Sequence, residues 1–149
     1  MAASKVCVIG AGAAGLCAAR HLADANLSPV VFEQTALVGG TWVFNESIGL
    51  DQNGLPIHSS MYKSLKTNLP KEVMAFPDYP FPTNLESFIE HADVKAYLEQ
   101  YTKDHNLMQH INFNTMVKNI SQDPQVLVFN FTFSRLSPTL YLDGLLLPI

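Results

Sequence analysis

The chain has 149 residues, of which 48% are hydrophobic and 15% are charged, a composition typical of a folded globular protein and not of a disordered one. Its net charge of −4 argues against nucleic-acid binding, and no run of about 18 apolar residues predicts a transmembrane helix. The two cysteines, Cys7 and Cys17, are expected to be packing residues in a reducing, cytoplasmic environment.

Residues 5–33 are predicted to form a strand, a tight turn, a helix and a second strand. Val6–Ile9 is a short apolar run of the kind found in strands buried on both faces. Apolar residues then recur at helical spacing from Leu16 to Ala23, and Pro29–Phe32 is predicted to be the second strand. This order indicates an α/β fold of the Rossmann-like type with a parallel sheet.

The turn after the first strand carries a glycine-rich pattern, G-x-G-x-x-G. The first glycine of such a turn permits the tight bend, the second lets a pyrophosphate approach the backbone, and the third lets helix and strand pack closely. The N–H groups and the dipole of the helix N-terminus also favour phosphate there. We therefore expect a dinucleotide at this loop, in contact with Gly10, Ala11, Gly12, Ala13, Ala14 and Gly15.

An acidic residue ends the second predicted strand. Glu33 follows Gly10 at about the spacing, roughly 20 residues, at which a carboxylate accepts hydrogen bonds from ribose hydroxyls. Its negative charge disfavours a 2′-phosphate, so the nucleotide at this site is expected to be FAD or NAD and not NADP. The neighbouring Gln34 is included in the predicted cofactor site.

A second glycine pair, Gly39 and Gly40, comes soon after the acid and is followed by Thr41 and Trp42. A pair in this position resembles the FAD-binding half of the two-dinucleotide flavoproteins. Disulfide reductases of this type carry a redox cysteine after the pair, which is missing here. Baeyer–Villiger monooxygenases share G-G-T-W but continue differently from residues 43–46 (VFNE). We expect Gly40, Thr41 and Trp42 to contact FAD.

The stretch from Ser59 to Pro82, SSMYKSLKTNLPKEVMAFPDYPFP, resembles the flavin-containing monooxygenases, which oxygenate soft nitrogen and sulfur atoms. The matching motifs are Tyr62-Lys63-Ser64, Thr67-Asn68, Lys71-Glu72, Met74 and the Phe-Pro-rich loop 76–82. The segment HADVKAYLEQYTKDHNL also looks like the helix that follows in the family, and the resemblance covers about residues 5–120.

The resemblance implies FAD and NADP as cofactors and oxygen transfer from a flavin C4a-hydroperoxide to a small amine or sulfide. It implies that Asn68 is the catalytic residue, hydrogen-bonded near the C4a and N5 edge of the flavin, and that Thr67 contacts NADP. A neutral amide could orient the peroxide without donating a proton too early. The prolines would fix the loop and its aromatics would exclude water; alternatively, the loop merely covers a sheet edge.

Two further segments have a clear period. Val94, Tyr97, Leu98 and Tyr101 fall at i, i+3, i+4 and i+7, which predicts one apolar helix face in the core. Residues 111–117 alternate as in a strand. The histidines show no ligand-like spacing, so no metal site is expected.

The chain is expected to hold the N-terminal portion of the FAD-binding domain in residues 1–120, because no second G-x-G motif follows Gly54. Residues 121–149 form a divergent apolar tail with two interpretations. In the first, the strand-like QVLVFNFTF is a native strand or hairpin of the domain. In the second, which we favour, the tail is a new C-terminus created by truncation. We expect partial FAD binding and no turnover by this chain alone.

Other functions stay open at this point. The chain could be a non-catalytic FAD-binding fragment, which bound flavin without turnover would indicate, or an NAD-dependent dehydrogenase, against which bound flavin would count. Animal members of the family are often attached to the endoplasmic reticulum through C-terminal segments, so membrane association is left open. The sequence specifies neither the oligomeric state nor the substrate.

Overall fold

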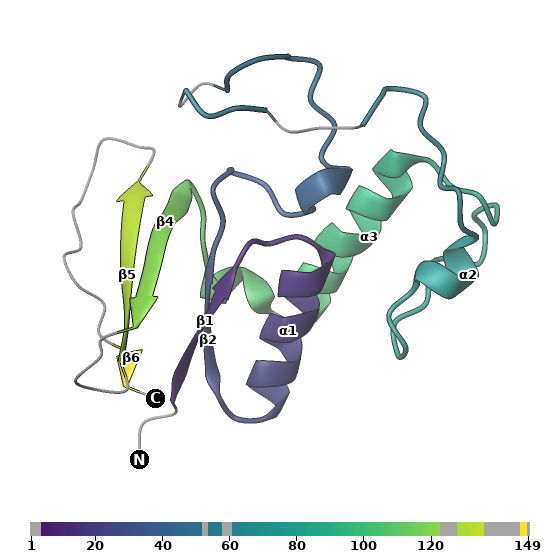
Figure 1. Cartoon of the computed structure of the whole chain (residues 1–149). Helices are drawn as coiled ribbons and strands as arrows, with labels where there is room; N and C mark the ends of the chain where they lie inside the picture. Colours follow the sequence, from purple (N-terminus) through teal and green to yellow (C-terminus); the bar gives the residue numbers. More distant parts are fainter. Residues whose placement is uncertain (1–3, 52–53, 58–60, 123–127, 136–146, 149) are drawn as a thin grey trace.

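The computed structural model describes residues 4–51, 54–57, 61–122, 128–135 and 147–148. Within them two sheets form (Figure 1). The parallel sheet has the order β1-β2-β3 and consists of β1 (Lys5–Ile9), β2 (Ser28–Phe32) and β3 (Ile111–Asn112). The antiparallel sheet has the order β4-β5-β6 and consists of β4 (Thr115–Gln122), β5 (Val128–Arg135) and β6 (Leu147–Pro148).

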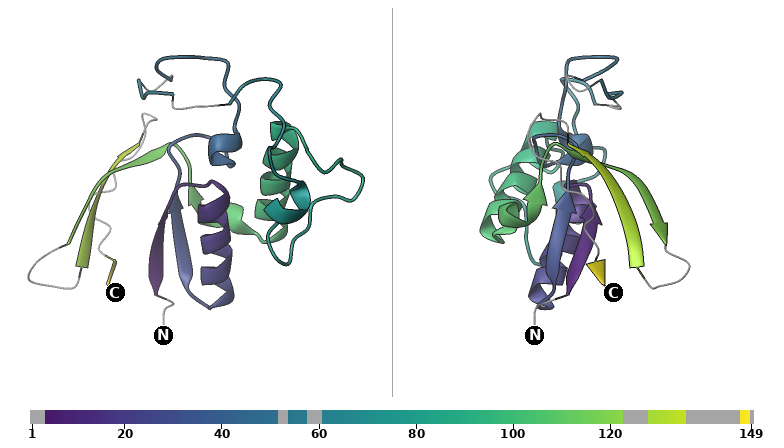
Figure 2. Two further views of the ribbon diagram at one scale, coloured as in Figure 1. Left: turned by 45° about the vertical axis from the view of Figure 1, so that its right-hand side comes forward. Right: turned by 90° about the vertical axis from the view of Figure 1, so that its left-hand side faces the viewer.

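The helices lie to one side of the parallel sheet, with α1 between the sheet and α3 in the left view of Figure 2. Their bounds are α1 (Ala13–Asp24), α2 (Lys71–Met74) and α3 (His91–Asp104), with two short 3-10 turns, η1 (Gly40–Trp42) and η2 (Leu107–His110). The predicted strand–helix–strand unit is therefore confirmed, and so is the α/β fold class. Among the described residues no helix combines the length and apolarity needed to cross a membrane.

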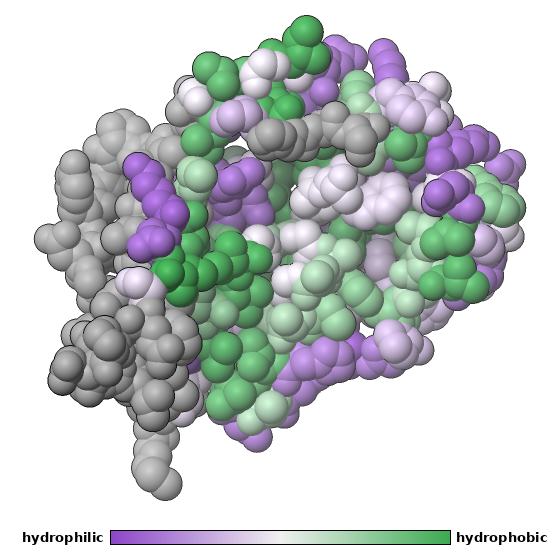
Figure 3. All heavy atoms as spheres, viewed as in Figure 1, coloured by the Kyte–Doolittle hydropathy of each residue, from purple (hydrophilic) through white to green (hydrophobic). Residues whose placement is uncertain are grey.

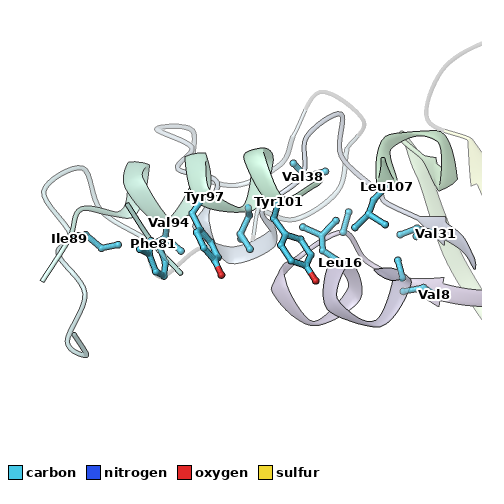
Figure 4. Close-up of a cluster of buried hydrophobic side chains, with 13 residues drawn as sticks. Val8, Leu16, Val31, Val38, Phe81, Ile89, Val94, Tyr97, Tyr101 and Leu107 are labelled. Atoms are coloured by element: carbon cyan, nitrogen blue, oxygen red, sulfur yellow. The ribbon is translucent and has the colours of Figure 1, made fainter. Parts of the chain in front are cut away.

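The core is continuous from the sheet to the far side of α3. Figure 4 shows Tyr97 and Tyr101 extending from α3, with Phe81 beside Tyr97 and Leu16 of α1 near Tyr101. All four residues of the predicted apolar face of α3 are buried, as is Leu16. The helical period of that segment thus identified its core-facing side correctly.

The strand predicted over residues 111–117 was wrong as a single element. β3 ends at Asn112, Asn114 takes a left-handed φ of 52°, and β4 begins at Thr115 in the other sheet. Asparagine tolerates this backbone conformation better than most residues, so the chain can turn there. Hydrogen bonds from Asn114 N to Thr35 O (3.0 Å) and from Thr115 N to Glu33 O (2.9 Å) tie the turn to the end of β2.

The start of the predicted tail takes part in a β-hairpin. β4 pairs antiparallel with β5 from Thr115 opposite Arg135 to Gln122 opposite Phe129, with an irregularity between Val117 and Asn119. This pairing fits the native-hairpin interpretation for residues 128–133 of QVLVFNFTF, whereas residues 125–127 lie outside the described part of the chain. That truncation produced the C-terminus stays a prediction.

The surface facing the viewer in Figure 1 is divided by polarity. In Figure 3 hydrophilic residues gather along the right-hand and lower rims, whereas the middle is pale to green and the top mixes apolar with hydrophilic residues. The segment after η1 forms the top, and two of its residues, Ile48 and Leu50, are strongly exposed, at 94% and 62%.

Candidate dinucleotide site

The glycine-rich loop connects β1 to α1, and two of its glycines are required for different reasons. Gly10 has a φ of +90°, and its N–H donates to Phe32 O at 2.8 Å. A Cβ added at Gly15 would lie 1.9 Å from the carbonyl oxygen of Gly10. The first and third glycines are therefore required by the bend and by the packing of helix against strand, as predicted from their spacing.

The second glycine pair packs directly on this loop, a contact that the sequence did not reveal. Gly39 N donates to Ala11 O at 3.0 Å. Gly40 has a φ of +55°, and a Cβ added there would lie 3.0 Å from Gly12 Cα. The structure thus brings together two predicted parts of the site, because the start of η1 is seated against the N-terminal end of α1.

The N-terminal end of α1 is suited to an anion. Its N-cap is Gly12, which makes no side-chain cap hydrogen bond, and the first turn contains no acidic residue. The first N–H groups of a helix have no acceptor within the helix. A Cβ at Gly12 would find only Gly40 within 4 Å, at 3.5 Å or more, so the loop surface beside it has room for a ligand. Ala13 is half-buried and Ala14 exposed in this turn.

Glu33 is 6% exposed and joins the end of β2 to the glycine loop. Its Oε2 accepts from Ala11 N at 2.8 Å, while its Oε1 accepts from both the N–H and the hydroxyl of Thr35, each at 2.8 Å. A carboxylate offers about four acceptor positions, so about one is left for a ribose hydroxyl. The predicted ribose-binding acid is therefore also a structural link within the site.

The remaining residues predicted to contact FAD differ in how far they are exposed. Gln34 and Thr41 are exposed, as is the backbone of Gly40. Trp42 is half-buried and packs against the hydrophobic core, so part of its ring has a structural role. The three residues of η1 therefore combine one core contact with two exposed positions.

Thr67 and Asn68 lie elsewhere in the fold. Their segment runs along the outside of α3, on the right-hand side of Figure 1, whereas the glycine loop is near the centre. Thr67 is 6% exposed, and its hydroxyl accepts from Ile89 N at 3.2 Å. Asn68 is exposed. The structure thus places the predicted pyrophosphate contacts and the predicted catalytic amide in different parts of the fold.

The proline-rich loop packs on α3. The rings of Phe81 and Tyr97 stack with centroids 3.9 Å apart and planes at 17°. The Tyr97 hydroxyl accepts from Phe76 N at 2.8 Å and donates to Tyr79 O at 2.6 Å. Aromatic residues of the loop therefore anchor it to α3. That these aromatics also exclude water from a site stays a prediction.

One ion pair and one further hydrogen bond add to this anchor. Arg20 of α1 donates to Asp78 at 2.5 Å, and this contact holds the pKa of the Asp78 carboxyl below its usual range. The Tyr79 hydroxyl donates to Asp104 at 2.5 Å, which lowers the pKa of that carboxyl. Burial, followed by the contact with Asp104, raises the pKa of the Tyr79 hydroxyl.

Among the described residues, the other reactive side chains do not form a second centre. Cys7 and Cys17 are free and half-buried, and burial raises the pKa of the Cys7 thiol, which suits a packing residue. In the described part of the chain no group of three or more His, Cys, Asp or Glu side chains could hold a metal ion. An open hollow of about 580 Å³, lined by Thr102, Lys103, Asn106, Met108 and Gln109, contains none of the predicted site residues.

Comparison with known proteins decides the family. The model of the flavin-binding monooxygenase-like family matches residues 3–129. The chain belongs to this family. The prediction made from residues 59–82 is thereby confirmed, and the flavin-binding character of the family agrees with the predicted FAD. The chain is accordingly related to oxidoreductases of the monooxygenase type.

Three relatives illustrate the extent of the match. Senecionine N-oxygenase of Tyria jacobaeae is 39% identical over 115 residues, which is 77% of this chain but 25% of that protein. The FMO GS-OX-like 11 protein of Arabidopsis thaliana is 40% identical over 129 residues, covering 78% of this chain and 77% of the relative. The solved S-allyl-L-cysteine S-oxygenase of Allium sativum is 34% identical, with a TM-score of 0.76 over 88% of this chain and 32% of that one.

The chain thus spans about a quarter of the length of the senecionine N-oxygenase that it matches. A solved steroid monooxygenase bound to NADP shares the fold, with a TM-score of 0.70 at 24% identity and coverage of 23% of that chain. The family match over residues 3–129 includes the glycine loop and α3, and it corresponds to about a quarter of each of these two proteins.

Proposed function

We propose that this protein is a flavin-dependent monooxygenase that uses FAD, NADPH and O₂, and that residues 1–120 bind the ADP half of FAD. The glycine loop carries this proposal, because its required glycines, the uncapped start of α1 and Glu33 meet at one place. Such a loop supplies N–H groups to the pyrophosphate and an acceptor to the ribose. FAD would supply the redox chemistry, and the protein would bind, orient and shield it.

The substrate proposed is a small molecule with a soft nitrogen or sulfur atom. The names of two relatives, an N-oxygenase and an S-oxygenase, support this class. We assign Asn68 as the catalytic residue that would hydrogen-bond at the reacting edge of the flavin, since it is exposed and neutral. An amide can donate and accept hydrogen bonds without changing its charge across the physiological pH range.

The proposal for the 149-residue chain is narrower than that for the whole family. Its described residues contain one glycine-rich dinucleotide loop, at Gly10–Gly15, and the negative charge of Glu33 at its ribose site disfavours the 2′-phosphate of NADP. We therefore propose that NADP does not bind at this glycine loop, and that the chain alone binds FAD without catalysing NADPH-dependent oxygenation.

Calorimetric titration with FAD, NAD and NADP separates this function from the alternatives. The proposal requires FAD to bind more tightly than either nicotinamide dinucleotide. Tighter binding of NAD than of FAD would favour the dehydrogenase alternative. With FAD added, the consumption of NADPH, followed by the absorbance of its reduced nicotinamide ring, should not exceed that with free FAD. Faster oxidation would contradict the inactivity of the chain alone.

A further inference from the structure

The segment before α2 forms a short antiparallel ribbon with the segment that leads into α3. His91 N donates to Leu65 O at 3.1 Å, Lys66 forms a bridge with Glu90, and Thr67 N donates to Ile89 O at 2.8 Å. Pairing of this kind places successive side chains on opposite faces. The burial of Thr67 and the exposure of Asn68 follow that alternation.

The ribbon departs from a regular ladder at Thr67. In a hydrogen-bonded antiparallel pair, the two residues exchange both of their N–H to carbonyl bonds. Here Thr67 N donates to Ile89 O, but Ile89 N donates to the Thr67 hydroxyl at 3.2 Å. The side chain of Thr67 thus takes the acceptor position that its own carbonyl would occupy in a regular ladder.

The main chain bulges directly after Thr67, where the side-chain hydroxyl replaces the carbonyl as acceptor. The next hydrogen bond runs from Lys71 N to Ser87 O at 2.7 Å, so residues 68–70 lie opposite Phe88 alone. Pro70, which has no N–H, lies within the bulge. Asn68 is its first residue and is exposed, whereas Ile89, opposite Thr67, is 3% exposed.

We propose that Thr67 is a positioning residue for Asn68: its hydroxyl satisfies the buried N–H of Ile89, which frees the Thr67 carbonyl from the ladder and lets the chain turn outward to present the Asn68 amide. The role assigned to the presented amide rests on the proposed function; the link between Thr67, Ile89 and Asn68 does not. In this arrangement the Thr67 side chain faces the core and does not contact the cofactor itself.

Three variants test the link in the chain without cofactor. Thr67→Val keeps the shape but removes the acceptor, Thr67→Ser keeps the acceptor but removes a methyl group, and Thr102→Val removes another buried hydroxyl, which donates to Leu98 O at 2.8 Å within α3. Amide hydrogen exchange and the NMR signals of Asn68 are measured in each. Loss of the hydrogen bond should speed exchange of the Ile89 amide about tenfold in Thr67→Val and shift the Asn68 signals.

Thr67→Ser should restore both observables, and Thr102→Val should leave both as in the wild type. The proposal is overturned if Thr67→Val leaves the Ile89 exchange and the Asn68 signals unchanged, or if Thr67→Ser behaves like Thr67→Val. Should Thr67→Val fail to fold, rapid exchange of the Ile89 amide in both the wild type and Thr67→Ser would also overturn it.

Addition of FAD provides a second readout that separates this proposal from the proposed function. Thr67→Val should change the absorption spectrum of bound flavin in the same direction as Asn68→Ala, with the FAD affinity within about twofold of the wild type, because the pyrophosphate contacts lie at the glycine loop. Failure of the wild-type chain to bind FAD would count against the proposed function, while the exchange experiment would still decide the role of Thr67.

Discussion

Residues 4–42 and residues 61–104 are held in shape by different means. In the first region backbone meets backbone, as where Gly40 lies against Gly12 and Gly39 N donates to Ala11 O. In the second region side chains add to a short backbone ribbon, through contacts such as the Phe81–Tyr97 stack and the Thr67 hydroxyl on Ile89 N.

The difference predicts two kinds of sensitivity. Where the backbone packs on itself, adding a single methyl group is the damaging change, because the neighbours are main-chain atoms that cannot move independently. Where side chains make the contacts, removing a hydroxyl or a ring is the damaging change, because a backbone group then loses its partner. The predictions below test this contrast from the largest expected effect to the smallest.

Gly15→Ala is expected to cause the largest loss of stability. The new Cβ would lie 1.9 Å from Gly10 O and 3.5 Å from a Val8 methyl, so β1 and α1 must separate. The expected cost is about 3 kcal/mol or more, the upper end of the range for overpacking. Thermal unfolding followed by circular dichroism measures it, with Gly12→Ala, where a Cβ finds ordinary contact distances, as the matched control. Equal unfolding temperatures for Gly15→Ala and the wild type would contradict the backbone account of this region.

Tyr97→Phe is expected to have the next largest effect. The change removes a hydroxyl that accepts from Phe76 N and donates to Tyr79 O, while it keeps the ring that stacks on Phe81. Leaving these backbone groups without their partner should cost about 1–3 kcal/mol. Urea unfolding measures the cost.

Tyr62→Phe serves as the control for this change, since Tyr62 is 58% exposed. Loss of its hydroxyl should alter the free energy of unfolding by no more than about 0.5 kcal/mol. Similar small losses in both variants would show that the hydroxyl of Tyr97 does not anchor the loop.

Acidification is expected to have the smallest effect. The pKa values of Asp78 and Asp104 are lowered by their contacts with Arg20 and with the Tyr79 hydroxyl. A carboxyl with a lowered folded-state pKa stabilises the fold above its unfolded pKa, about 3.9, and this contribution is lost as the pH falls through the folded value. The docking of the loop should therefore weaken below about pH 4.

Hydrogen exchange of the Phe76 amide as a function of pH, corrected for the intrinsic rate, measures this weakening. The double variant with Asp78→Asn and Asp104→Asn should show a flatter profile, because neither side chain can then be protonated. An unchanged pH profile in the double variant would show that these two carboxyls do not hold the loop in place.

The sequence predicted features that depend on local spacing. The glycine loop follows from G-x-G-x-x-G. The buried face of α3 follows from the period of Val94, Tyr97, Leu98 and Tyr101. Both signals could be recognised because each lies within a short stretch of consecutive residues. The alternation over residues 111–117 was misleading, since a period of two does not reveal that the chain turns at Asn114 into another sheet.

Contacts between distant segments could not be predicted from such patterns. Nothing near Gly40 indicates that it packs on Gly12, and nothing near Arg20 indicates Asp78 as its partner. For Thr67 the resemblance to the family implied a cofactor contact, whereas its burial depends on the register of the ribbon with Ile89. The partners of these residues are set by the fold and not by the neighbouring sequence.

The central claim is that the glycine loop binds FAD, and one measurement tests it most directly. The wild-type chain and Gly12→Ala are each titrated with FAD, passed through gel filtration and examined by visible absorption. We predict a flavin band that travels with the folded wild-type chain. In an equally folded Gly12→Ala the affinity should be at least about tenfold lower, or 1.4 kcal/mol, because the added methyl group is expected to hinder the approach of the pyrophosphate to the backbone. A folded wild-type chain without flavin, or equal affinities in both proteins, would contradict the claim.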